Sequence, residues 1–274
     1  MSSAQLKLRF WGVRGSIPVS GATTLLHGGN TSCVSVEVGD QLFALDAGTG
    51  LRLLGKSLDG PTHLTLLLSH LHWDHLHGLP FFAPLFRPGT NVDVWCPAQP
   101  QASLLLQHLS HLVGKPGFPM GLGDLAGRLT PLPVAPSLTL ERPPVRVTAL
   151  PVRHPDPCFA FRLDAGAASV VYLTDHEHHP EDHAPLVAFC RGASVLCMDC
   201  MYVPEEMPER QGWGHSSLAQ AADLARDAAV GRLLLLHHHP DHDDQQLSAL
   251  EARLTALFPA GQNAREGLEL SLPL

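Results

Sequence analysis

Three apolar runs in this chain end within one residue of a histidine or an aspartate. Residues 64–68 read LTLLL and lead into "SHLHWDHLHG" (69–78), residues 169–174 read SVVYLT before Asp175, and residues 232–236 read RLLLL before His237. Continuous apolar runs of this length are typical of strands covered on both faces. Because the ends of neighbouring buried strands meet at one edge of a sheet, we expect a polar site at that edge.

The apolar periodicity and the turn signals predict an α/β fold. Strands are expected at 6–11, 33–38, 41–46, 64–69, 92–96, 145–150, 158–163, 169–174, 194–199 and 232–236. Helices are expected at 50–57, 100–112, 183–191, 217–229 and 244–257. Ser217 and Gln220 form a capping-box pattern at the start of one of these helices. Two groups of strands, each followed by helices, predict two packed sheets with helices outside.

The length of 274 residues fits one large domain spanning 1–274. The stretch from Ala83 to Pro136 is rich in proline and glycine, and we expect an irregular excursion that forms a wall or lid over one face. No apolar run approaches the roughly 18–20 residues that span a bilayer, and the N-terminus lacks a signal-peptide core. We therefore expect a cytoplasmic protein with no membrane partner.

The formal net charge of −8, without a lysine or arginine cluster, argues against a surface that coats a polyanion. The six cysteines are scattered, and Cys197 and Cys200 form a lone CxxC. A zinc knuckle needs a second such pair, so reduced, partly buried thiols are expected.

The histidine-rich run predicts a metal site. His70 and His72 point the same way at an extended strand end because side chains alternate there, and Asp74 and His75 follow where the strand turns into a short helix. Imidazole and carboxylate ligands suit Zn²⁺, with Mn²⁺ and Fe²⁺ as alternatives.

Two metals would need further ligands, and the chain offers them at other strand ends. His154 follows strand 145–150, Asp175 follows strand 169–174, and His237 follows strand 232–236. The run of three histidines leaves the last choice open: His237 is favoured because it directly follows the strand, and His238 and His239 remain alternatives. The other histidines of this part of the chain are interpreted as structural or surface residues, namely His77, His176, His178, His179 and His183.

The order of the motifs resembles a known family. "FWGVRGSIP", "GGNTSC", "LDAGTG", "SHLHWDH", "YLTDHE", "GWGHSS" and "LLLLHHHPDHDD" follow one another as in the metallo-β-lactamase-fold superfamily. The match is closest to its phosphodiesterase branch, which includes tRNase Z and cyclic-nucleotide or cyclic-phosphate phosphodiesterases. The resemblance implies an αββα sandwich of two mixed sheets flanked by helices, and homodimers are common among such relatives.

The resemblance also implies a dinuclear site with two divalent metal ions. One metal would be held by His70, His72 and His154, and the other by Asp74, His75 and His237. Asp175 would bridge the two metals opposite a hydroxide that attacks the phosphate, and Asp74 would help to position it. Asp46 would orient a ligand imidazole; alternatively, it only caps the glycine-rich turn that follows it.

A second pair, Asp199 and His215, matches an element of tRNase Z-like enzymes. There an acidic residue orients a histidine from a G-H-S/T motif, and that histidine stabilises the phosphate and protonates the leaving oxygen. A carboxylate-paired histidine suits this role because the carboxylate raises its pKa and fixes its tautomer. The alternative is that His215 only braces the helix that follows.

The expected function is dinuclear hydrolysis of small cyclic or nucleotide phosphodiesters. RNA is the alternative substrate, in a tRNase Z-like 3′-processing endonuclease; a thioesterase or lactamase, a module without activity and a diiron redox enzyme are weaker alternatives. Arg14 is expected near the metals as a phosphate contact or as a salt-bridge partner in a turn. Two departures from the family pattern, Pro155–Asp156–Pro157 and His176, are expected at the pocket rim, where they put substrate specificity in question.

Overall fold

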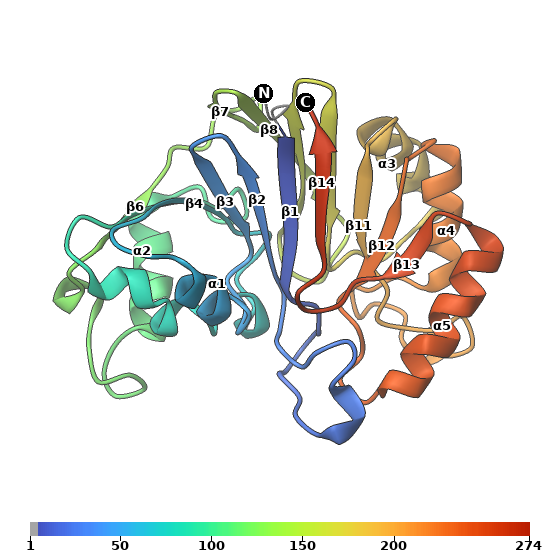
Figure 1. Cartoon of the computed structure of the whole chain (residues 1–274), viewed down its shortest axis with the longest axis horizontal. Coiled ribbons are helices and arrows are strands. Elements are labelled where there is room, and N and C mark those ends of the chain that lie inside the picture. Colours follow the sequence, from blue (N-terminus) through green and yellow to red (C-terminus); the bar gives the residue numbers. More distant parts are fainter. Residues whose placement is uncertain (1–4) are drawn as a thin grey trace.

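The computed structural model describes residues 5–274, in which two seven-stranded sheets pack face to face (Figure 1). The first sheet has the strand order β14-β1-β2-β3-β4-β5-β6 and the second the order β13-β12-β11-β10-β9-β8-β7. In the first sheet, pairing is antiparallel from β14 to β3 and parallel from β3 to β6. In the second, it is antiparallel from β7 to β10 and parallel from β10 to β13. Both sheets are therefore mixed.

The elements have the following bounds. The first sheet contains β1 (Gln5–Gly12), β2 (Cys33–Val38), β3 (Gln41–Leu45), β4 (His63–Leu67), β5 (Asn91–Trp95), β6 (Arg128–Pro131) and β14 (Glu269–Pro273). The second contains β7 (Thr139–Arg142), β8 (Val145–Val152), β9 (Cys158–Ala165), β10 (Ala168–Leu173), β11 (Val195–Asp199), β12 (Leu233–Leu236) and β13 (Gly261–Asn263). The helices are α1 (Leu51–Ser57), α2 (Ala102–Leu112), α3 (His183–Cys190), α4 (Leu218–Asp227) and α5 (Asp244–Leu257).

Helices cover the outer face of each sheet. In Figure 1, α1 and α2 lie on one side of the molecule, and α3, α4 and α5 lie on the other. Strand β12 shows why its sequence is apolar throughout: Leu234 and Leu236 join the core between the sheets, while Leu233 and Leu235 pack under α4 and α5. All four side chains are at most 1% exposed. The predicted α/β sandwich with helices outside is confirmed.

Every expected strand and helix is present, with ends shifted by no more than about two residues. The expected capping box is also present, since the backbone amide of Ser217 donates to the Gln220 Oε1 at 2.9 Å. The sequence missed β6, β7, β13 and β14, which are the outermost strands of the two sheets. Edge strands are short and have one unpaired side, so their apolar pattern is weak.

The proline-rich stretch 83–136 contains the expected strand β5 and the expected helix α2. It also returns to the first sheet as β6, which was not expected. The expectation of a wall is met by α2, because His108 and Leu112 line a hollow of about 520 Å³ together with Trp73 of the histidine-rich run. Within the described residues, no helix is long and apolar enough to cross a membrane.

Candidate metal centre

The two sheets deliver the predicted ligands to one place. The histidine-rich run follows β4 of the first sheet, whereas His154, Asp175 and His237 follow β8, β10 and β12 of the second. Three polar residues that directly follow strands or lie one residue beyond them adopt left-handed backbone conformations, with φ of 61° at Asp46 after β3, 35° at Asp175 and 58° at His237. Such conformations cost of order 1 kcal/mol for a residue other than glycine and often mark functional sites. These turns therefore direct the three side chains toward the site, and each left-handed residue lowers the local stability of the fold.

One group of side chains gathers around Asp74. The Asp74 Oδ2 lies 3.2 Å from the Nε2 of His75 and 3.2 Å from the Nε2 of His237. The Oδ1 of Asp175 lies 3.2 Å and 3.1 Å from the same two nitrogens. The backbone amide of Ser16 donates to the Asp74 Oδ2 at 2.8 Å and so fixes this carboxylate.

A second group gathers at the other oxygen of Asp175. Its Oδ2 lies 3.6 Å from the Nε2 of His70 and 3.9 Å from the Nε2 of His154. One ligand atom from each of His70, His72, His154 and Asp175 falls within 4.8 Å of the others. The two oxygens of Asp175 thus face two separate groups, which is the arrangement that a bridging ligand requires.

The outer nitrogens of the buried imidazoles are already engaged. The His75 Nδ1 lies 2.7 Å from the Asp46 Oδ2, and the His70 Nδ1 lies 3.0 Å from the Ser69 Oγ. The Nε2 atoms of His70 and His75 are buried and form no hydrogen bond, although carboxylate oxygens lie 3.6 Å and 3.2 Å away. A buried nitrogen without a partner is costly, and a metal ion would satisfy it. The residues present therefore fit two divalent cations.

Electrostatics favour the protonation states that metal ligands need at Asp74, Asp175 and His70, whereas at His75 burial lowers the pKa but the neighbouring carboxylates outweigh it and raise the pKa. Burial acts to raise the pKa of Asp74 and Asp175, but the neighbouring imidazoles, His237 and His75 among them, outweigh it and hold both values well below the usual range. Burial and the nearby His75 lower the pKa of His70, so this imidazole stays neutral. Ionised carboxylates and neutral imidazoles are the forms that bind metals.

Asp199 and His215 form a pair beside the two groups. The His215 Nδ1 lies 3.3 Å from the Asp199 Oδ2, and the Asp199 side chain is fully buried. Asp199 also accepts hydrogen bonds from the backbone amides of Met201 at 3.0 Å and Ser216 at 2.8 Å. Burial lowers the pKa of His215, but Asp199 and the other nearby carboxylates raise it to about 9. His215 also stacks on His237 with ring centroids 5.1 Å apart, which places it at the metal centre.

The structure distinguishes the three consecutive histidines. His237 faces the Asp74 group, as described above. The His238 Nε2 lies instead 3.2 Å from the carbonyl oxygen of Ala264, and burial lowers the pKa of His238 to about 3. His239 contacts His242, with ring centroids 5.0 Å apart. Of the three, only His237 is among the possible metal-binding groups of the described chain.

Two expectations are wrong, namely that Arg14 contacts phosphate and that His176 lies at the pocket rim. Arg14 is fully buried, and its guanidinium donates to the carbonyl oxygens of Gly28, His239 and His242. It therefore holds the loop after β12 in place and is not available to phosphate. His176 is fully buried and does not lie at the rim.

Other residues of the site escaped the sequence analysis. The Tyr172 hydroxyl donates to the Asp46 Oδ2 at 2.9 Å, and the Ser69 backbone amide donates to the Asp46 Oδ1 at 2.8 Å. These contacts hold Asp46 in place against the His75 Nδ1, so Asp46 orients the His75 ring, which was one of the two interpretations of this residue. Gly15 approaches His237 so closely that a Cβ there would lie 2.5 Å from the His237 Nδ1. The glycines of "GVRGSIP" were a signal for such an approach.

Comparison with known proteins identifies the family. A family model described as the beta-lactamase superfamily domain matches residues 43–238. The chain belongs to the beta-lactamase superfamily. Membership in this superfamily, with the fold above, confirms the predicted metal-dependent hydrolase of the metallo-β-lactamase fold.

Similar proteins within the superfamily include both a metallo-hydrolase and a ribonuclease. The chain is 28% identical over 247 residues to the probable metallo-hydrolase YhfI of Bacillus subtilis, covering 80% of this chain and 85% of that protein. It is 26% identical over 278 residues to ribonuclease BN of Salmonella paratyphi C, covering 83% and 88%.

Solved structures share the fold over almost the whole chain. A diphosphatase of the PhnP family has a TM-score of 0.73 at 19% identity, covering 98% of both chains. The short form of human tRNase Z has a TM-score of 0.70 at 16% identity, covering 98% of this chain and 100% of that chain.

Proposed function

We propose that this chain is a dinuclear, metal-dependent phosphodiester hydrolase that acts on small cyclic or nucleotide phosphodiesters. The observation that supports it most directly is that Asp175 turns one oxygen to each of two metal-binding groups, with the His215–Asp199 pair beside them. Because both sheets contribute side chains to this centre, residues 1–274 would form one hydrolase domain. Zn²⁺ suits the ligand set best, with Mn²⁺ and Fe²⁺ as alternatives.

The proposed roles of the residues follow from their surroundings. Two divalent cations at this centre would lower the pKa of a bound water and neutralise phosphate charge. Asp74, held by the Ser16 amide, would orient the attacking water and hold its proton. Burial lowers the pKa of His215, but Asp199 raises it above its usual value, so His215 can carry a proton, contact the phosphate and donate that proton to the leaving oxygen. Asp199 would keep His215 in that state and orientation.

Small substrates are favoured by the charge of the chain. A net charge of −8 opposes the accumulation of a large polyanion on the surface. The structural similarity to a PhnP-family diphosphatase is in line with a small phosphate ester. RNA 3′ processing is the second candidate, supported by the similarity to ribonuclease BN and to human tRNase Z.

A substrate panel tests the proposal. Protein loaded with Zn²⁺ or Mn²⁺ is assayed against bis-p-nitrophenyl phosphate, 2′,3′- and 3′,5′-cyclic nucleotides, cyclic dinucleotides and precursor tRNA. Turnover of a cyclic nucleotide or dinucleotide above that of precursor tRNA is the expected result. Preference for precursor tRNA would favour the second candidate, and hydrolysis of thioesters or β-lactams without any phosphodiester would refute both. Light scattering tests the homodimer, which we propose on the resemblance alone.

The role of His215 has its own test. A proton donor matters most for a poor leaving group, so His215→Ala should lose about 10²–10⁴-fold in kcat on a substrate with an alkoxide leaving group. The same variant should lose much less on bis-p-nitrophenyl phosphate, whose leaving group departs without a proton. His63→Ala, which changes an exposed histidine at the far end of β4, is the control. Equal losses on both substrates would contradict the proton-donor role.

A further inference from the structure

The connection between β8 and β9 places a carboxylate against a proposed metal ligand. Residues 153–157 join the two strands, and Asp156 lies between Pro155 and Pro157. Each proline ring fixes its own φ, and Pro157 also restricts the backbone of the residue before it. The two prolines therefore restrict the backbone conformation around Asp156, although its side chain is 66% exposed.

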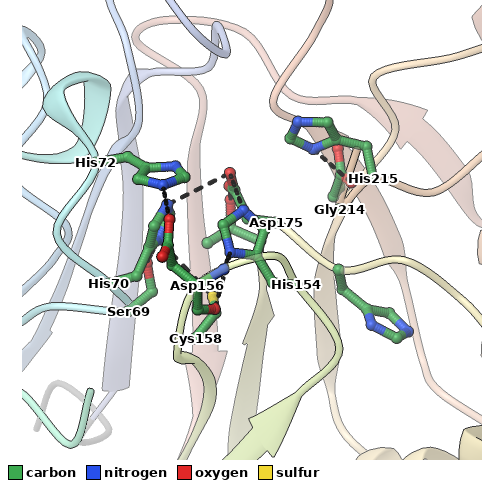
Figure 2. A network of polar contacts seen from close by, with 12 residues as sticks. Ser69, His70, His72, His154, Asp156, Cys158, Asp175, Gly214 and His215 are labelled. Carbon is green, nitrogen blue, oxygen red and sulfur yellow. Dashed lines mark hydrogen bonds and ion pairs between the residues drawn. The ribbon is translucent and has the colours of Figure 1, made fainter. Parts of the chain in front are cut away.

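Asp156 contacts both histidines that flank it in space. Its Oδ2 lies 2.8 Å from the Nε2 of His72, and Figure 2 shows the two side chains joined. The Nδ1 of His154 lies 3.0 Å from the carbonyl oxygen of Asp156 and 3.3 Å from its amide nitrogen. The carbonyl contact is the shorter, and it leaves the His154 Nε2 free to face Asp175. One turn thus touches two members of the same metal-binding group.

The contact with His72 decides which of its nitrogens carries the hydrogen. An ionised carboxylate only accepts hydrogen bonds, so the hydrogen of a neutral His72 must lie on Nε2. The lone pair is then on Nδ1, and this nitrogen is available to a metal. His70 and His154 have the opposite arrangement, because their Nδ1 atoms are engaged and their Nε2 atoms face Asp175.

His72 depends on such a partner more than the other histidines do. His70 and His75 are fully buried, and their surroundings hold the rings on several sides. The His72 side chain is 42% exposed, so packing alone leaves it freedom to rotate. A hydrogen-bonded partner of this kind commonly contributes about 10–100-fold to metal affinity.

We propose that Asp156 is a positioning residue of the metal centre: it fixes His72 in the Nε2–H form, so that Nδ1 binds the metal shared with His70 and His154. The inference rests on the proposed metal centre but not on the substrate. It also gives a role to the Pro155–Asp156–Pro157 sequence, one of the departures from the family pattern.

Three variants test it. Asp156→Ala removes the acceptor, Asp156→Asn keeps an acceptor oxygen without the charge, and Asp59→Ala is a control at an exposed loop aspartate. The Zn²⁺ affinity of each protein is measured by competition with a chelator. Asp156→Ala should bind Zn²⁺ at least about tenfold more weakly than the wild type, whereas Asp156→Asn and the control should bind it about as tightly as the wild type. Long-range ¹H–¹⁵N spectra of the metal-free protein should show His72 protonated on Nε2 in the wild type and in Asp156→Asn, and a mixture of tautomers in Asp156→Ala.

Two results would overturn the inference. Zn²⁺ affinity of Asp156→Ala equal to that of the wild type would show that His72 needs no partner. An Asp156→Asn variant as weak as Asp156→Ala would show that the negative charge, and not a hydrogen-bond acceptor for His72, is what this position contributes. Neither measurement uses a substrate. A protein that binds Zn²⁺ with the expected dependence but hydrolyses no phosphodiester would refute the proposed function and leave this inference standing.

Discussion

The ion pair between Asp199 and His215 should make stability depend on pH in a defined direction. Burial lowers the pKa of His215, but Asp199 and its neighbours raise it to about 9, against an ordinary value of 6.5. The His215 side chain is only 11% exposed, so solvent screening is modest. This difference corresponds to about 3 kcal/mol of folding free energy. Because the folded-state pKa is the higher one, this contribution is complete below about pH 6.5 and is lost as the pH rises through about 9.

The perturbation is Asp199→Asn in the metal-free protein. It removes the negative charge that holds the proton on His215. It also places the asparagine NH₂ group against one of the two backbone N–H groups that donate to Asp199 in the wild type. The second cost, about 1–3 kcal/mol, does not depend on pH. Urea denaturation at pH 6 and pH 10 separates the two contributions. The variant should be less stable than the wild type at both pH values, and by about 3 kcal/mol more at pH 6.

A second variant checks that the pH dependence belongs to this pair. In a His215→Gln background the extra cost of Asp199→Asn at pH 6 should fall well below about 3 kcal/mol, because the proton that Asp199 holds on His215 is gone and only the more distant His237, 3.7 Å away, still faces Asp199. A cost of Asp199→Asn that is equal at the two pH values in the wild-type background, or larger at pH 10, would refute the reasoning.

Three further predictions follow from close contacts in the site. Gly15→Ala would place a Cβ 2.4 Å from the Met201 Cε and 2.5 Å from the His237 Nδ1, so it should cost about 1–3 kcal/mol in urea denaturation and weaken Zn²⁺ retention. Gly123→Ala, which meets open space, should do neither. Asp46→Ala leaves the His75 Nδ1 and other buried donors without an acceptor and should cost about 3–5 kcal/mol; a loss below about 1 kcal/mol would contradict this account. Zn²⁺ at about 100 times its Kd should stabilise the fold by about 2.7 kcal/mol, measured as a fall in Tm when a chelator is added; an unchanged Tm would argue against the site.

The ligand candidates could be found in the sequence because each lies next to a recognisable strand. A run such as LLLL before His237 reports that the strand is covered on both faces, and it marks the strand end to within a residue or two. His70, Asp175 and His237 were singled out on that ground. Their convergence could also be anticipated, since strand ends of one sandwich share an edge. Metal binding by the full set stays a prediction that the experiments above address.

Only the tertiary structure decided how side chains point once the strands have ended. The left-handed turn at His237 aims its ring at Asp74, a residue 163 positions earlier in the chain, and turns His238 toward Ala264. Arg14 has the sequence context of a phosphate contact, yet it binds carbonyl groups of a loop more than 220 residues away. A buried strand needs a run of apolar residues, so the local sequence predicts which strands are buried. The direction of a polar side chain depends on partners from distant segments, and these meet only when both sheets have packed.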